Sequence, residues 1–94
     1  MPTCDKHPVT VKKYKGSLEE LAKDLENLRY DKFCELLDYL ILAYDDRAEI
    51  DARAGRTVLS SRLYNTATSL VAVRRHVNDV WDVCRSKMDT SEEK

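Results

Sequence analysis

The stretch TVLSSRLYNTATSLVAVRRHVNDVWDVCRSKM, residues 57–88, is the longest run of the chain that has a helical pattern and neither glycine nor proline. Two rows of residues recur through it every seven positions, as on the buried side of an amphipathic helix. We therefore predict one long helix over residues 57–88 whose buried side combines these two rows. The first row is Leu63, Leu70, Val77 and Cys84, and the second is Leu59, Thr66, Val73 and Val80.

A shorter helix is predicted to begin at Ser17. Ser17 and Glu20 have the spacing of a capping box, in which each side chain binds the backbone amide of the other residue. The apolar stripe that follows loses its phase near residue 30, so we expect this helix to end by residue 29. Asp31 is then expected to cap the next helix.

The next helix is predicted over residues 32–53. Its end is marked by Gly55, because a residue at this position often adopts positive φ. Thr57 is expected to cap the long helix that follows. The apolar row predicted to face the core is Phe33, Leu37, Leu40 and Tyr44.

Length and composition predict a single all-α domain. The chain has 94 residues, 43% hydrophobic and 35% charged, with two glycines and two prolines. We expect a small antiparallel bundle of three helices over residues 17–88, two shorter and one long and C-terminal, elongated because the long helix exceeds the width of a compact chain. Residues 1–16 are predicted to form an extended arm or short strand, and residues 89–94 a disordered tail.

The chain carries its charge unevenly. Residues 17–52 hold eleven acidic and four basic residues, whereas residues 53–88 hold seven basic and two acidic ones, although the net charge is −1. No stretch is apolar enough for a membrane span or a signal peptide, so we expect a cytoplasmic protein. Three cysteines without paired spacing predict free thiols rather than a disulfide framework.

Two surfaces are candidates for binding another protein. On the helix over residues 32–53, acidic residues surround two apolar ones, and we interpret this set as an acidic ridge that is either solvated or docks on a basic partner. The ridge consists of Glu35, Asp38, Tyr39, Leu42, Asp45, Asp46 and Glu49. The second candidate is the row of Arg74 and Trp81, which lies within the apolar arc of the long helix. Arg74 is predicted either to pair with Asp38 or Glu35, or to form an interface with Trp81.

A nucleic-acid contact is an alternative interpretation. Arg74 and Arg75 form the basic cluster of the long helix with His76, and Lys12, Lys13 and Lys15 in the arm could add phosphate contacts. Because Asp79 and Asp82 compensate Arg75 on the same helix, we expect a solvated surface here instead.

A remoter alternative is metal-dependent chemistry. Glu35 with Asp38, and Asp46 with Glu49, give an E-x-x-D and D-x-x-E spacing that superficially resembles the MazG-like nucleotide pyrophosphohydrolases, a resemblance that implies Mg²⁺ binding and nucleotide hydrolysis. It covers one helix only, and Lys23 follows Glu19-Glu20 where that family has an E-E-x-x-E motif.

Zinc is a weaker alternative still. Cys4 and His7 supply half a zinc site by spacing, which Cys34 or Cys84 would have to complete from distant helices.

We therefore predict no enzymatic activity and no cofactor. The function expected is that of a protein interaction module, such as an inhibitor, an adaptor or an assembly subunit, and a phage-encoded inhibitor of host defence is one form it could take. The expected partner is a protein with a basic surface, and a homodimer is also expected, because a long helix with a broad apolar arc leaves surface for a second subunit.

Overall fold

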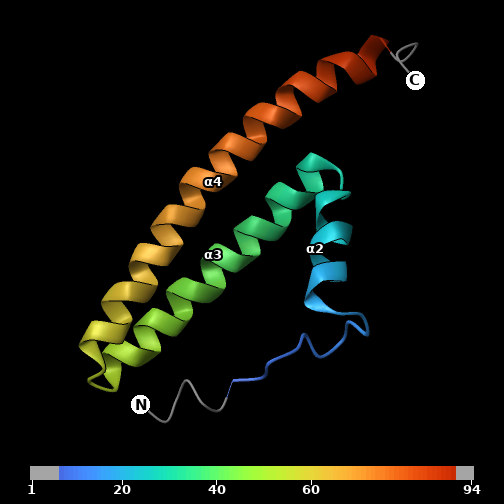
Figure 1. Cartoon of the computed structure of the whole chain (residues 1–94). Coiled ribbons are helices and arrows are strands. Elements are labelled where there is room, and N and C mark those ends of the chain that lie inside the picture. The colour runs from blue at the N-terminus through green and yellow to red at the C-terminus, as the bar shows by residue number, and fades with distance from the viewer. Residues whose placement is uncertain (1–6, 91–94) are drawn as a thin grey trace.

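The computed structural model describes residues 7–90, with side chains up to Lys87. Within this range the chain forms three helices and no strand: α2 (Leu18–Glu26), α3 (Tyr30–Arg53) and α4 (Thr57–Thr90) (Figure 1). The all-α class, the three helices and the long C-terminal helix are confirmed. The predicted zinc ligand Cys4 and residues 91–94 of the predicted tail lie outside the described residues.

Local signals fixed the beginning of α2. The Ser17 hydroxyl accepts a hydrogen bond from the Glu20 amide at 3.1 Å, and the Glu20 carboxylate accepts one from the Ser17 amide at 2.7 Å. The capping box is thus confirmed. Between α3 and α4, Gly55 has a φ of 84°, as predicted for a residue that ends a helix in the left-handed region.

Two predicted caps are wrong. Helix α3 begins at Tyr30, so Asp31 lies inside its first turn, and its carboxylate accepts two hydrogen bonds from the Arg29 guanidinium at 2.6 and 2.9 Å. Thr57 is already helical, and the carbonyl of Arg56 accepts the hydrogen bond from the Ser60 amide at 2.9 Å.

Helices α3 and α4 form an antiparallel hairpin that is the main packing unit. Two contacts define its register: the Ser60 hydroxyl donates to the Ala48 carbonyl at 2.8 Å, and the Cys34 thiol lies 3.8 Å from the Arg74 carbonyl. Three of these four residues are small, which lets the two backbones approach closely. The buried residues of the hairpin are Cys34, Leu37, Ala48, Asp51, Ser60 and Ala67.

The buried side of α4 is rotated from its predicted position. Ala67 is 3% exposed, whereas Val73 and Val80 are 44% and 42% exposed. The row of Ala67, Arg74 and Trp81 therefore joins the predicted first row at the contact with α3, and the predicted second row lies beside it. A helix that packs against a single neighbouring helix buries a narrow row of residues, spaced alternately three and four positions apart, rather than a broad apolar arc.

The predicted core row of α3 is also only partly correct. Leu37 is buried as predicted, but Leu40 is 38% exposed. The positions that face α4 are instead Cys34, Ala48 and Asp51, which continue the same three- and four-residue steps. Cys34 is buried as a free thiol, in agreement with the prediction that the cysteines do not form disulfides.

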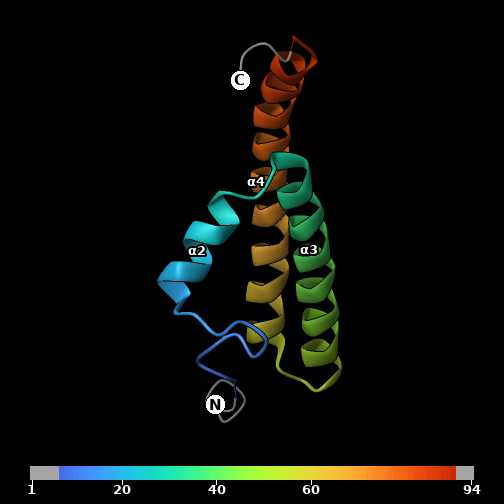
Figure 2. The same ribbon diagram turned by 90° about the vertical axis from the view of Figure 1, so that its right-hand side faces the viewer.

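The molecule is elongated, as its long helix required. Its principal extents are 56 × 28 × 14 Å and its radius of gyration is 16.8 Å, against about 12 Å for a compact chain of this length. Helix α2 does not follow α3 along α4: it folds back beside the hairpin, so the C-terminal end of α4 extends beyond α3 (Figures 1 and 2). None of the residues of α2 is buried.

The described part of the arm, residues 7–16, contains a turn and no strand. The Tyr14 amide donates to the Val11 carbonyl at 3.1 Å, and the Tyr14 hydroxyl donates to the Asp24 carboxylate at 2.6 Å. The predicted short strand is therefore absent from residues 7–16, since the arm has no strand to pair with. No described helix is long and apolar enough to cross a membrane.

Candidate functional site

Arg74 forms an ion pair with Asp38 across the hairpin. The Arg74 Nε and one terminal nitrogen donate to the two Asp38 carboxylate oxygens at 2.9 and 3.3 Å. This is one of the two partners predicted for Arg74 from the sequence. Hydrogen bonds and charge from Asp38 raise the pKa of Arg74 above its ordinary value. Because the side chains are 35% and 50% exposed, the pair contributes little stability, although it links the two helices across the hairpin.

Trp81 has a different partner. The Arg29 guanidinium lies over the Trp81 ring, with 5.5 Å between the guanidinium carbon and the ring centroid. Arg29 also holds Asp31, and this contact lowers the pKa of Asp31 and raises that of Arg29. These contacts tie the α2–α3 connection to α4. The structure therefore does not bring Arg74 and Trp81 together in one free face, because each binds a residue of the same chain.

The acidic ridge lies on the outside of α3. Tyr39 and Leu42 are 63% and 60% exposed, although both are large apolar side chains. Lys32 pairs with Glu35 at 3.3 Å, and Arg53 pairs with Glu49 at 2.7 Å.

Two ridge carboxylates have no cationic partner among the described residues. Neither Asp45 nor Asp46 has an ion pair within the described part of the chain. The ridge therefore presents free negative charge next to exposed apolar surface.

The ridge and the ion pair meet in one shallow hollow. A depression of about 360 Å³ is lined by Asp38, Ile41 and Leu42 from α3 and by Val71 and Arg74 from α4. Val71 is 47% exposed and extends the apolar surface of Leu42 onto α4. Of the predicted site residues, the structure thus unites Asp38, Leu42 and Arg74, whereas Trp81 lies farther along α4.

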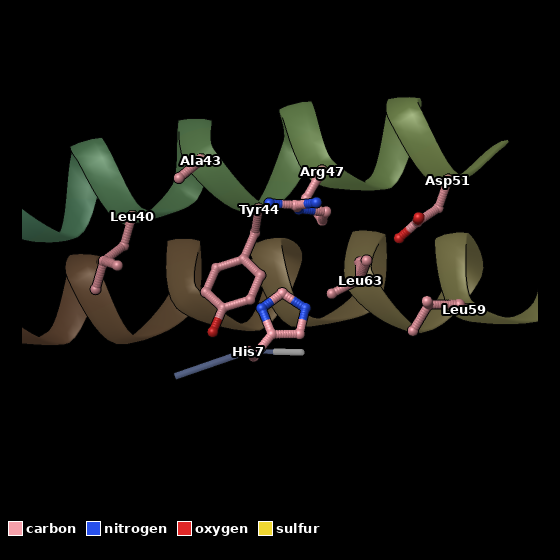
Figure 3. Close-up of a pocket in the computed structure, with 8 residues that line it drawn as sticks. All are labelled: His7, Leu40, Ala43, Tyr44, Arg47, Asp51, Leu59 and Leu63. Atoms are coloured by element: carbon pink, nitrogen blue, oxygen red, sulfur yellow. The ribbon is translucent and has the colours of Figure 1, made fainter. Parts of the chain in front are cut away.

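A second hollow lies on the other side of the hairpin, beneath the arm. It measures about 460 Å³, and Figure 3 shows its lining of Leu40, Ala43, Tyr44, Leu59 and Leu63 together with three polar residues. The polar residues are His7, Arg47 and Asp51. Most of this hollow is therefore apolar.

Asp51 was missed by sequence reasoning. It is fully buried, and one carboxylate oxygen accepts hydrogen bonds from Arg56 at 2.8 Å, whereas the other has no hydrogen-bond partner. The sequence did indicate a buried position here, because Asp51 follows Tyr44 and Ala48 at the four- and three-residue steps of the buried side of α3. A charged residue at a core position near a helix end indicates a partner across the turn.

The residues predicted for metal binding and for nucleic-acid contact can also be placed in the structure. Within the described residues, no three histidine, cysteine or acidic side chains lie close enough to hold a metal ion together. The basic residues considered for nucleic-acid contact are exposed: Arg75, His76, Lys12 and Lys13.

Comparison of the chain with protein-family models, with curated proteins and with solved structures finds no match in any of the three.

Proposed function

We propose that this chain is a non-enzymatic protein interaction module whose acidic ridge docks on a basic surface of another protein. The observation that supports it is the exposure of Leu42 and Tyr39 on the same ridge as Asp45 and Asp46, which form no ion pair within the described part of the chain. Tyrosine is among the side chains that contribute most of the binding energy in protein interfaces, the contacts around such a residue exclude water, and charges steer the encounter. An inhibitor, an adaptor and an assembly subunit would all work in this way.

The hollow beside the ridge supports the same proposal. Leu42 and Val71 form an apolar patch that the Arg74–Asp38 pair borders. The patch is small, so binding would combine a few apolar contacts with charge attraction. We expect the association rate to fall with rising salt, because Asp45 and Asp46 attract a basic partner at long range.

The test uses three tagged full-length chains in the native cell: wild type, Leu42→Arg and Val83→Arg. Val83 is the matched control, because it is 57% exposed on α4 and lies outside the ridge. We expect one protein to be recovered with wild type and with Val83→Arg but lost with Leu42→Arg. Binding of that purified protein is then measured at increasing salt. If no recovered protein depends on Leu42, the proposal is wrong.

A further inference from the structure

The hollow beneath the arm has apolar walls and two different ends. Its polar residues are Asp51, which is fully buried, and Arg47 and His7, which are exposed (Figure 3). Its volume of about 460 Å³ lies in the range of pockets that hold small molecules. The hollow therefore has the size and the lining of a small-molecule site. Its walls are formed by Leu40, Ala43, Tyr44, Leu59 and Leu63.

Asp51 gives the buried end of the hollow an acceptor that the chain does not use. One carboxylate oxygen, Oδ1, accepts the hydrogen bonds from Arg56 at 2.8 Å. The other oxygen, Oδ2, is buried and has no hydrogen-bond partner among the described residues. Figure 3 shows the carboxylate directed from α3 toward Leu59 and Leu63 of α4. Because a buried acceptor is stable when a donor reaches it, this end favours a ligand that carries an N–H or O–H group.

Arg47 gives the exposed end of the hollow an unpaired cation. It precedes Asp51 by four positions, so the two residues lie on the same side of α3 with about 5 to 6 Å between their Cβ atoms. Arg47 forms no ion pair within the described part of the chain, whereas Arg56 compensates the charge of Asp51. The exposed end therefore has an excess of positive charge, which favours a carboxylate.

We propose that this hollow binds a small apolar carboxylate that carries a hydrogen-bond donor at its other end. The donor binds Asp51 Oδ2, the carboxylate binds the Arg47 guanidinium, and the apolar body lies against the leucines of the walls. The arm covers the ligand, since His7 lines the same hollow. This site is separate from the acidic ridge, so it goes beyond the proposed function.

The two polar ends exclude simpler ligands. An apolar amine would bring its positive charge next to Arg47 and Arg56, and like charges disfavour binding. An apolar acid without a donor would leave Asp51 Oδ2 without a partner, as it is in the free protein. Only a ligand with both groups matches both ends of the hollow.

The test titrates the full chain with three probes of similar shape and follows the methyl resonances by NMR. Indoleacetate carries the carboxylate and an N–H group, naphthaleneacetate lacks the N–H, and methylindole lacks the carboxylate. We expect indoleacetate to shift the resonances of Leu40, Leu59 and Leu63 and to bind about tenfold or more tightly than either other probe, because each of these loses one charged hydrogen bond. The methyl groups of Val71 and Val83 lie outside the hollow and should not shift.

Arg47→Gln gives a second measurement. Arg47 is exposed, so this variant should keep its fold, which circular dichroism verifies. It should weaken indoleacetate about tenfold and leave methylindole unchanged, because only indoleacetate has a carboxylate. Arg75→Gln is the matched control, since it removes the same charge from an exposed position of α4 that does not line the hollow. It should leave the affinity for both probes unchanged.

Three results would overturn the inference. The first is the absence of shifts in the leucines of the hollow with indoleacetate up to its solubility limit. The second is equal affinity for indoleacetate and naphthaleneacetate, because Asp51 would then bind no donor. The third is an equal effect of Arg47→Gln and Arg75→Gln, which would reduce the attraction to net charge. Failure here leaves the proposed function standing, because that function depends on Leu42 and the acidic ridge.

Discussion

Replacement of the buried Asp51 by alanine tests the part of the fold that the sequence did not reveal. The Asp51 carboxylate joins the end of α3 to the start of α4, because it accepts hydrogen bonds from the Arg56 side chain at 2.8 Å. The Arg56 amide also donates to the Asp51 carbonyl at 2.8 Å, a backbone contact that alanine keeps. Asp51→Ala therefore removes the side-chain link and leaves the turn otherwise unchanged.

The expected loss is about 2 kcal/mol of unfolding free energy. A hydrogen bond to a charged group contributes about 1.5 to 3 kcal/mol. Breaking a fully buried pair costs about 3 to 5 kcal/mol, but the Arg56 side chain is 32% exposed and can be hydrated again, so the loss stays below that range. A domain of this size has about 5 to 14 kcal/mol of total stability, so a loss of 2 kcal/mol would lower Tm by roughly 8 to 16 °C.

The assay is urea unfolding followed by circular dichroism at one fixed protein concentration, because association would change apparent stability. Asp45→Ala is the control, since Asp45 is a partly exposed carboxylate of the same helix, and its loss should stay within about 0.5 kcal/mol. Asp51→Asn keeps an acceptor for Arg56 and should fall between the two. If Asp51→Ala is as stable as Asp45→Ala, the Asp51–Arg56 contact does not hold the hairpin together.

Three further predictions concern separate contacts. Gly55→Ala should cost about 1 kcal/mol because φ is 84°, and Gly55→Asn should cost less in the same urea assay; equal losses would contradict the conformational reason. Ala48→Leu should cost about 1 to 3 kcal/mol by overpacking a residue that is fully buried against α4, and an unchanged midpoint would contradict the close approach. The hydrogen bond to Asp24 raises the pKa of Tyr14 above 10.0. The tyrosinate absorbance of Tyr14 is the part of the wild-type signal that Tyr14→Phe lacks, and this part should appear above pH 10.0. In Asp24→Asn the same absorbance should appear at a lower pH than in wild type. The bond is therefore present below pH 10 and is lost as the pH rises through the raised pKa; no shift in Asp24→Asn would refute it.

Much of the candidate site followed from helical spacing. The residues of the acidic ridge share a side of α3 because steps of three and four residues return to the same face. Arg74 was assigned two alternatives, and the structure pairs it with Asp38. The contact between Arg29 and Trp81 could not be predicted, because it depends on where the α2–α3 connection crosses α4.

The sequence by itself determined the helices and several of their ends. The capping box of Ser17 and Glu20 and the positive φ of Gly55 are local properties, which depend only on neighbouring backbone groups. The length of the uninterrupted run from residue 57 also determined that the molecule is elongated.

Only the tertiary structure decided which side of each long helix is buried. The apolar arc of α4 is wide enough that several different sides of the helix could face α3. The side that does so carries the small residues Ser60 and Ala67, which together with Ala48 of α3 let the two helices approach closely. That rotation buried Asp51 and left Val73 partly exposed. A pattern in one helix cannot specify this outcome, because the closest packing depends on the side chains of both helices.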